Sequence, residues 1–159
     1  MLAGQVNDAR ERLLASFEGL SDDEMTQPGV DGGRSVRDIL ANIAAWDRAY
    51  AEMFRAMLSG QRHAILDMDE EGIDTFNRDQ ATADHDKPVS EVLSDLDAAW
   101  NDLMGVLRDA DNVQLFAPAP GDEHADMSIA ACLSVIVSED EAHAEMIEQW
   151  REGPGNRQE

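Results

Sequence analysis

The stretch 127-MSIAACLSVIVSEDEAHAEMIEQWR-151 decides the predicted fold. Its apolar residues recur at helical steps of three and four, and continuing those steps gives the stripe Cys132, Ile136, Glu139, His143, Ile147 and Trp150. Two polar residues, Glu139 and His143, thus stand where the period places the core, and we expect both to point inward. Because an inward carboxylate without a partner is costly, the fold should supply a metal ion, a cation or hydrogen-bond donors there.

Three further long amphipathic segments precede this one, so we expect helices near residues 2–20, 36–59, 89–110 and 127–152. Ser35 and Asp38 form a capping-box pattern at the start of the second segment. On that segment's apolar stripe stands a third polar residue, Asn42. On the first segment, Arg10 is expected on the outward face.

A long connection over residues 60–88 separates the second and third helices, and it is long enough to cross the end of a bundle. Within it we expect a short helix around residues 73–83, with Ile73 and either Phe76 or Asn77 directed at the bundle. The predicted fold class is therefore all-α, a four-helix bundle with a long crossover connection. We expect a single domain over residues 1–152 and a frayed tail over residues 153–159.

The charge of the chain narrows the classes of partner. Its 159 residues include 34 acidic and 12 basic ones, for a formal net charge of −22. Such a field repels phosphate backbones and anionic lipid, so we expect neither nucleic acid nor membrane as a partner. The single cysteine excludes an internal disulfide, and no segment resembles an export signal, so we expect a cytoplasmic protein.

Three segments in order carry a family resemblance: residues 33–46, residues 73–77 and residues 138–151. Together they resemble the DinB-like superfamily. Within it the chain is similar to the ClbS/DfsB-type four-helix proteins, and also to the metal-binding domain of mycothiol-dependent maleylpyruvate isomerase. The resemblance spans nearly the whole chain.

The resemblance implies a metal-type site. Many members hold a divalent metal on three inward residues, usually histidines, and the matching positions here are Asn42, Glu139 and His143. The Glu-x-x-x-His spacing resembles the isomerase branch, in which a glutamate replaces one histidine and zinc is still held. Asn42 is the departure, because a neutral amide replaces a histidine there.

Two interpretations of this cluster remain open. In the first, Glu139 and His143, one turn apart, converge on a divalent ion such as zinc or nickel, with Asn42 as a weak third donor. In the second, no metal binds, and Asn42 donates an amide N–H to the Glu139 carboxylate while His143 satisfies the other oxygen. The three residues should lie in one pocket between the second and fourth helices.

Other candidate pocket residues have simpler interpretations. Cys132 is expected to be a small buried apolar residue, since no basic group within helical reach lowers its pKa. Trp46 and Tyr50 are expected mainly in the core, although Trp46 could wall a pocket for an apolar substrate and the Tyr50 hydroxyl could point into it.

Two classes of function follow. One is a protective bundle that binds or detoxifies a reactive small molecule, or serves in stress, with weak or no metal. The alternative, implied by the resemblance, is an enzyme: a divalent-metal-dependent S-transferase or isomerase that uses a thiol such as mycothiol or bacillithiol. In both cases the wide Ala-rich faces of the first and last helices favour a homodimer.

Overall fold

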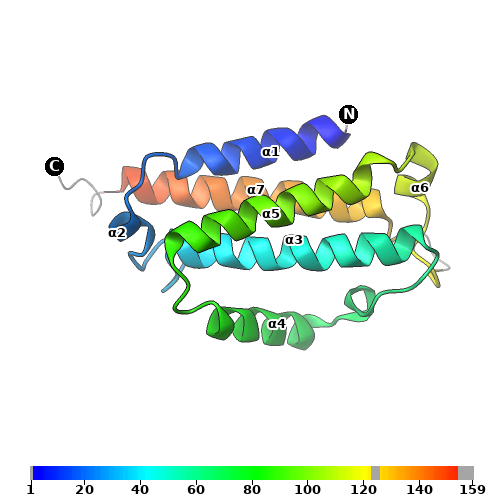
Figure 1. The fold of residues 1–159 in the computed structure, drawn as a ribbon, viewed down its shortest axis with the longest axis horizontal. Coiled ribbons are helices and arrows are strands. Elements are labelled where there is room, and N and C mark those ends of the chain that lie inside the picture. The colour runs from blue at the N-terminus through cyan, green and yellow to red at the C-terminus, as the bar shows by residue number, and fades with distance from the viewer. Residues whose placement is uncertain (1, 123–125, 154–159) are drawn as a thin grey trace. The chain divides into compact units, whose positions relative to one another are not determined.

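The computed structural model describes residues 2–122 and 126–153, and in this part of the chain every regular element is a helix. The elements, drawn in Figure 1, are α1 (Leu2–Ser16), α2 (Asp22–Met25), α3 (Val36–Leu58), η1 (Ala64–Asp67), α4 (Glu70–Ala83), α5 (Val89–Arg108), α6 (Asn112–Phe116) and α7 (Ile129–Glu152). The all-α prediction is confirmed. Of the predicted tail, all but Gly153 lies outside the described residues.

The four long helices lie where the periodicity predicts them, with corrections at their ends. α1 ends at Ser16 rather than near residue 20, because the chain turns through Gly19, whose φ is 81°. α3 ends at Leu58 ahead of Gly60, which has a φ of 75°. Two short elements, η1 and α6, were not predicted, because they lack a repeated apolar stripe. No helix among residues 2–122 and 126–153 combines the length and the apolar character needed to cross a membrane.

The chain divides into two compact units, residues 1–39 with 132–159, and residues 40–131. In the first unit, α1 packs against the part of α7 that follows Ala131, as Figure 1 shows in blue and orange. Apolar side chains of both helices are buried in this unit: Val6, Ala9 and Leu13 from α1, and Leu133, Ile136, Ala144 and Ile147 from α7. Apolar burial of this kind is the main stabilising contribution to the unit.

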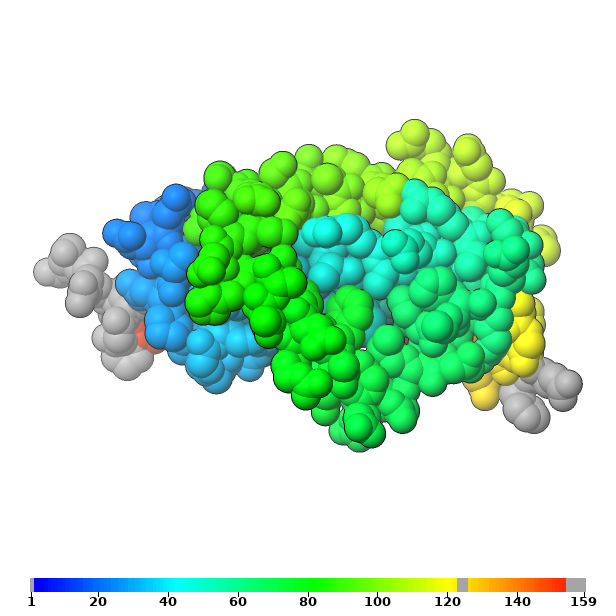
Figure 2. Space-filling view, turned by 60° about the horizontal axis from the view of Figure 1, so that its bottom comes forward, coloured from blue at the N-terminus to red at the C-terminus, as the bar shows by residue number. Residues whose placement is uncertain are grey.

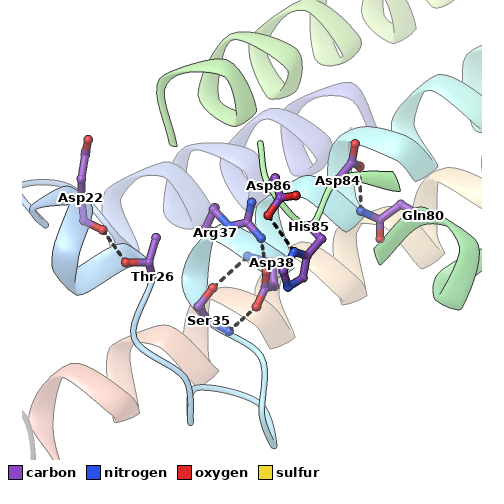
Figure 3. A network of polar contacts seen from close by, with 9 residues as sticks. All are labelled: Asp22, Thr26, Ser35, Arg37, Asp38, Gln80, Asp84, His85 and Asp86. Carbon is purple, nitrogen blue, oxygen red and sulfur yellow. Dashed lines mark hydrogen bonds and ion pairs between the residues drawn. The ribbon is translucent and has the colours of Figure 1, made fainter. Parts of the chain in front are cut away.

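The predicted capping box at the start of α3 is present. The backbone N–H of Asp38 donates to Ser35 Oγ at 3.1 Å, and the backbone N–H of Ser35 donates to Asp38 Oδ2 at 3.0 Å (Figure 3). Burial alone would raise the pKa of Asp38, but the hydrogen bonds from Ser35 and Arg37 outweigh it and hold that pKa below its usual value. The carboxylate thus stays charged at the positive end of the helix dipole.

In the second unit, α3 and α5 supply the apolar core and α4 supplies almost none. The buried side chains include Leu40, Ile43, Met53 and Phe54 from α3, and Val92, Leu96 and Leu103 from α5. No residue of α4 is buried, and Ile73, which we predicted to point at the bundle, is 40% exposed. Figure 2 shows α4, in green, on the surface of this unit.

Candidate functional site

The inward carboxylate of α7 is Asp140, not Glu139. Asp140 is buried at 2% exposure, whereas the side chain of Glu139 is exposed, so the predicted inward orientation of Glu139 is wrong. The buried stripe runs from Ile136 to Asp140 by a step of four and then on to Ala144 and Ile147. Steps of three and four are both helical, so the periodicity alone could not choose between two adjacent acidic residues.

The cation that neutralises Asp140 comes from α1. Arg10 Nε donates to Asp140 Oδ2 at 2.7 Å and Arg10 Nη2 donates to Oδ1 at 3.2 Å, a two-point contact in which each side chain is only 3% exposed. Arg10 was expected on the outward face, and that expectation is wrong. We expected an inward carboxylate on this helix to contact a metal ion, a cation or hydrogen-bond donors. Asp140 contacts a cation, through its ion pair with Arg10.

His143 is half-buried on α7 and carries an unsatisfied ring nitrogen. Its Nδ1 is buried, and no group among the described residues lies within hydrogen-bond distance of it. Burial lowers the pKa of His143 below its usual value, more than the neighbouring carboxylate of Glu139 raises it, and the charge of Arg34 lowers it further. His143 is therefore neutral at neutral pH, and its Nδ1 is available to a donor or a ligand.

Asn42, on α3 in the second unit, uses its amide to hold α4. Its Nδ2 donates to Asn77 Oδ1 at 3.0 Å and to Gln80 Oε1 at 2.9 Å. Trp46 Nε1 also donates to Asn77 Oδ1, at 2.8 Å. An indole nitrogen can only donate, so the oxygen of Asn77 must face it, and Asn42 must then present its nitrogen.

Both amide hydrogens of Asn42 are thus committed inside the second unit. The predicted donation from Asn42 to Glu139 is wrong for this reason. Phe76 and Asn77, which we predicted as alternatives, both contact Trp46 of α3. The ring centroids of Phe76 and Trp46 lie 4.2 Å apart, and Asn77 Oδ1 accepts from Trp46 Nε1. The hydrogen bonds of Asn42 to Asn77 and Gln80 were not predicted, because both partners lie more than thirty residues from Asn42 in the sequence.

The polar contacts continue beyond Gln80. Gln80 Nε2 donates to Asp84 Oδ2 at 2.8 Å (Figure 3), and Lys87 Nζ contacts Asp84 Oδ1 at 2.9 Å and Asp95 Oδ2 at 2.7 Å. A charged Asp84 can only accept hydrogen bonds, so Gln80 must direct its amide nitrogen at Asp84 and its amide oxygen at Asn42. The chain of contacts links α3, α4 and α5.

The remaining candidates are two aromatic side chains and a cysteine. Trp46 and Tyr50 are half-buried with ring centroids 5.9 Å apart, and Tyr50 stacks in turn on Phe54. Cys132 is 4% exposed, which confirms the expectation of a buried residue, and burial raises the pKa of its thiol to about 11. An open groove of about 530 Å³ between α3 and α5, near Arg55 and Asp102, is lined by none of these candidates.

The donor set fits a resident metal poorly. Asn42 can offer an ion only a neutral amide oxygen, Glu139 is solvated, and His143 supplies one imidazole nitrogen. Within residues 2–122 and 126–153, no three His, Cys, Asp or Glu side chains gather as a metal site. The clustering of Asn42, Glu139 and His143 in one pocket stays a prediction.

Comparison with known proteins extends this picture. Residues 5–147 match the DinB superfamily. No curated protein matches the sequence. The structure titled "Sibling Lethal Factor Precursor - DfsB" is 16% identical, with a TM-score of 0.82 over 99% of this chain and 96% of that one. An uncharacterised protein of Escherichia coli UTI89 is 11% identical, with a TM-score of 0.79 over 95% of this chain and 91% of that one.

At such low identity these structures show the fold alone. They nevertheless match nearly the full length of the chain, and the predicted all-α, DinB-like four-helix bundle with a long crossover is confirmed. The match over residues 5–147 covers far more than half of the sequence. The chain belongs to the DinB superfamily.

Proposed function

We propose that this chain is a protective, small-molecule-binding member of the superfamily that works without a resident metal at Asn42, Glu139 and His143. One observation carries the proposal: both amide hydrogens of Asn42 are donated to α4, at Asn77 and Gln80. The residue that stands where metal-binding relatives have histidine therefore acts as a structural anchor.

Ligand chemistry supports the metal-free assignment. Catalytic zinc takes three protein ligands and a water, and it favours imidazole, thiolate and carboxylate over a neutral amide oxygen. Glu139 is exposed, so water competes for its oxygens. His143 alone would then have to hold the ion, which one imidazole does weakly.

The resemblance to ClbS/DfsB-type proteins supports the protective class, in which a reactive compound is sequestered or detoxified. The ring pair of Trp46 and Tyr50 offers apolar faces suited to such a compound. We further propose a cytoplasmic homodimer. Exposed apolar residues on the first unit's helices, Leu14 at 44% and Val135 at 49%, support the dimer.

One observation favours the second candidate, a metal-dependent thiol transferase or isomerase. His143 Nδ1 is buried and unsatisfied, and Glu139 stands one helical turn away on the same helix. An unsatisfied buried acceptor costs about 1–3 kcal/mol, and a bound cation would remove that cost. We therefore keep this function as the alternative outcome of the test.

The test measures metal content and metal response together. Protein isolated without added metal is assayed for zinc and nickel and is then titrated with each ion. At each step, the binding of aromatic electrophiles is measured by the quenching of tryptophan fluorescence. We expect substoichiometric metal and quenching that is indifferent to chelator. A stoichiometric ion that is lost in His143→Ala, but kept in the matched exposed-histidine control His85→Ala, would establish the alternative.

A further inference from the structure

We propose that α4 is a hinged cover on α3, which opens as a unit while α3 and α5 of the same unit stay folded. The inference concerns only residues 40–131 and does not depend on whether a metal binds. Opening would uncover one face of Trp46 together with the amide of Asn42. Such a surface suits a planar apolar ligand that carries a hydrogen-bond acceptor.

α4 contributes no fully buried side chain to the unit. None of its residues is buried, whereas α5 in the same unit buries Val89, Val92, Leu96, Ala99 and Leu103. The ring centroid of Phe76, which is half-buried, lies 4.2 Å from that of Trp46. Elements with little apolar burial are the ones that open before global unfolding.

Hydrogen bonds between polar side chains hold α4 on α3. Asn42 and Trp46 donate three hydrogen bonds to Asn77 and Gln80 of α4, and all four side chains are half-buried. When α4 lifts, water can replace each of these bonds, so no buried polar group is left unsatisfied. Release is therefore far cheaper than removal of a helix held by apolar packing.

Each end of the cover is also fastened by contacts to parts of the unit other than α3. Before α4, Arg62 contacts the Asp67 carboxylate at 2.7 Å and donates to the Pro120 carbonyl at 2.8 Å. After α4, Lys87 ties Asp84 to Asp95 of α5. These anchors keep the cover attached while its middle moves, and the surface view shows α4 lying outermost in this region (Figure 2).

Native-state hydrogen exchange across a series of low denaturant concentrations tests the proposal. We expect α4 amides to exchange faster than those of α3 and α5, with a weaker dependence on denaturant, as local opening requires. Asn77→Ala removes two side-chain bonds and should speed exchange of α4 by roughly tenfold, with α5 unchanged. The matched control is Asn101→Ala, which deletes an exposed amide on α5 and should leave α4 unchanged.

The wild-type profile is decisive even if a variant folds poorly. Exchange of α4 at the rate and denaturant dependence of α3 would show that α4 opens only by global unfolding, and would overturn the proposal. Equal acceleration of α3, α4 and α5 in Asn77→Ala would do the same. Quenching of tryptophan fluorescence by acrylamide should also rise in Asn77→Ala, since opening exposes Trp46; an unchanged value would count against the cover.

Discussion

Replacing Asp140 should destabilise the protein severely, whereas replacing its neighbour Glu139 should not. Asp140→Ala deprives the buried Arg10 of a two-point carboxylate partner, with Nε to Oδ2 at 2.7 Å and both side chains 3% exposed. Removing one member of a buried ion pair costs about 3–5 kcal/mol. For a chain of this size, about 1 kcal/mol lowers Tm by roughly 2–4 °C, so Tm should fall by roughly 6–20 °C.

Glu139→Ala is the matched control, since it removes an exposed carboxylate one residue away on the same helix, and surface changes stay within about 0.5 kcal/mol. Urea unfolding and a thermal scan of both variants measure the difference. Asp140→Asn should lie between them, because the amide keeps the shape and one acceptor but loses the charge. Equal losses in Glu139→Ala and Asp140→Ala would refute the assignment of the inward carboxylate.

Three further outcomes follow from the structure. Burial alone would raise the pKa of Asp84, but the hydrogen bonds from Gln80 and Lys87 hold that pKa below its ordinary value of 3.8. The free energy that Asp84 contributes to folding is therefore complete above pH 3.8 and is lost as pH falls through the lower pKa of the folded state. In urea titrations, the difference in unfolding free energy between wild type and Asp84→Asn should narrow in acid. Cys132, with a pKa of about 11, should react with iodoacetamide at least about 100-fold more slowly in the native protein than in the unfolded chain, as followed by mass spectrometry. Ser35→Ala removes a helix cap and should cost about 1 kcal/mol by chemical unfolding, and no measurable loss would contradict the capping role.

Local sequence signals predicted the helices well. The cap at Ser35 and the apolar stripes of α3 and α5 depend on residues a few positions apart, which is the range over which periodicity and capping act. The glycine turns at Gly19 and Gly60 set helix ends that the stripes alone overran. The short α6, with a capping box between Asp111 and Gln114, was missed because it has no second apolar turn.

The candidate site was predicted less well because its contacts span long sequence separations. Glu139 and Asp140 are adjacent, so the choice between them depends on the cation of Arg10, which stands 130 residues earlier. The role of Asn42 likewise depends on Asn77, which the sequence placed toward the bundle only as an alternative to Phe76 and without a partner. The sequence predicted an inward carboxylate on α7 and an inward amide on α3, but it did not predict their partners, Arg10 and Asn77.

The partnership of Asn42 with α4 also changes what a histidine at that position should do. A neutral imidazole carries one N–H where the amide carries two, so Asn42→His must abandon either Asn77 or Gln80. The apo variant should lose on the order of 1–3 kcal/mol, and the lower end is expected at a half-buried position.

The thermal unfolding midpoint of the wild-type protein, measured with zinc and with chelator, tests the metal-free assignment most directly. A ligand at about 100 times its Kd stabilises the folded state by about 2.7 kcal/mol, which a thermal scan resolves easily. We predict the same midpoint in zinc and in chelator for the wild type. A wild-type midpoint that rises with micromolar zinc, and that no longer responds in His143→Ala, would contradict the account.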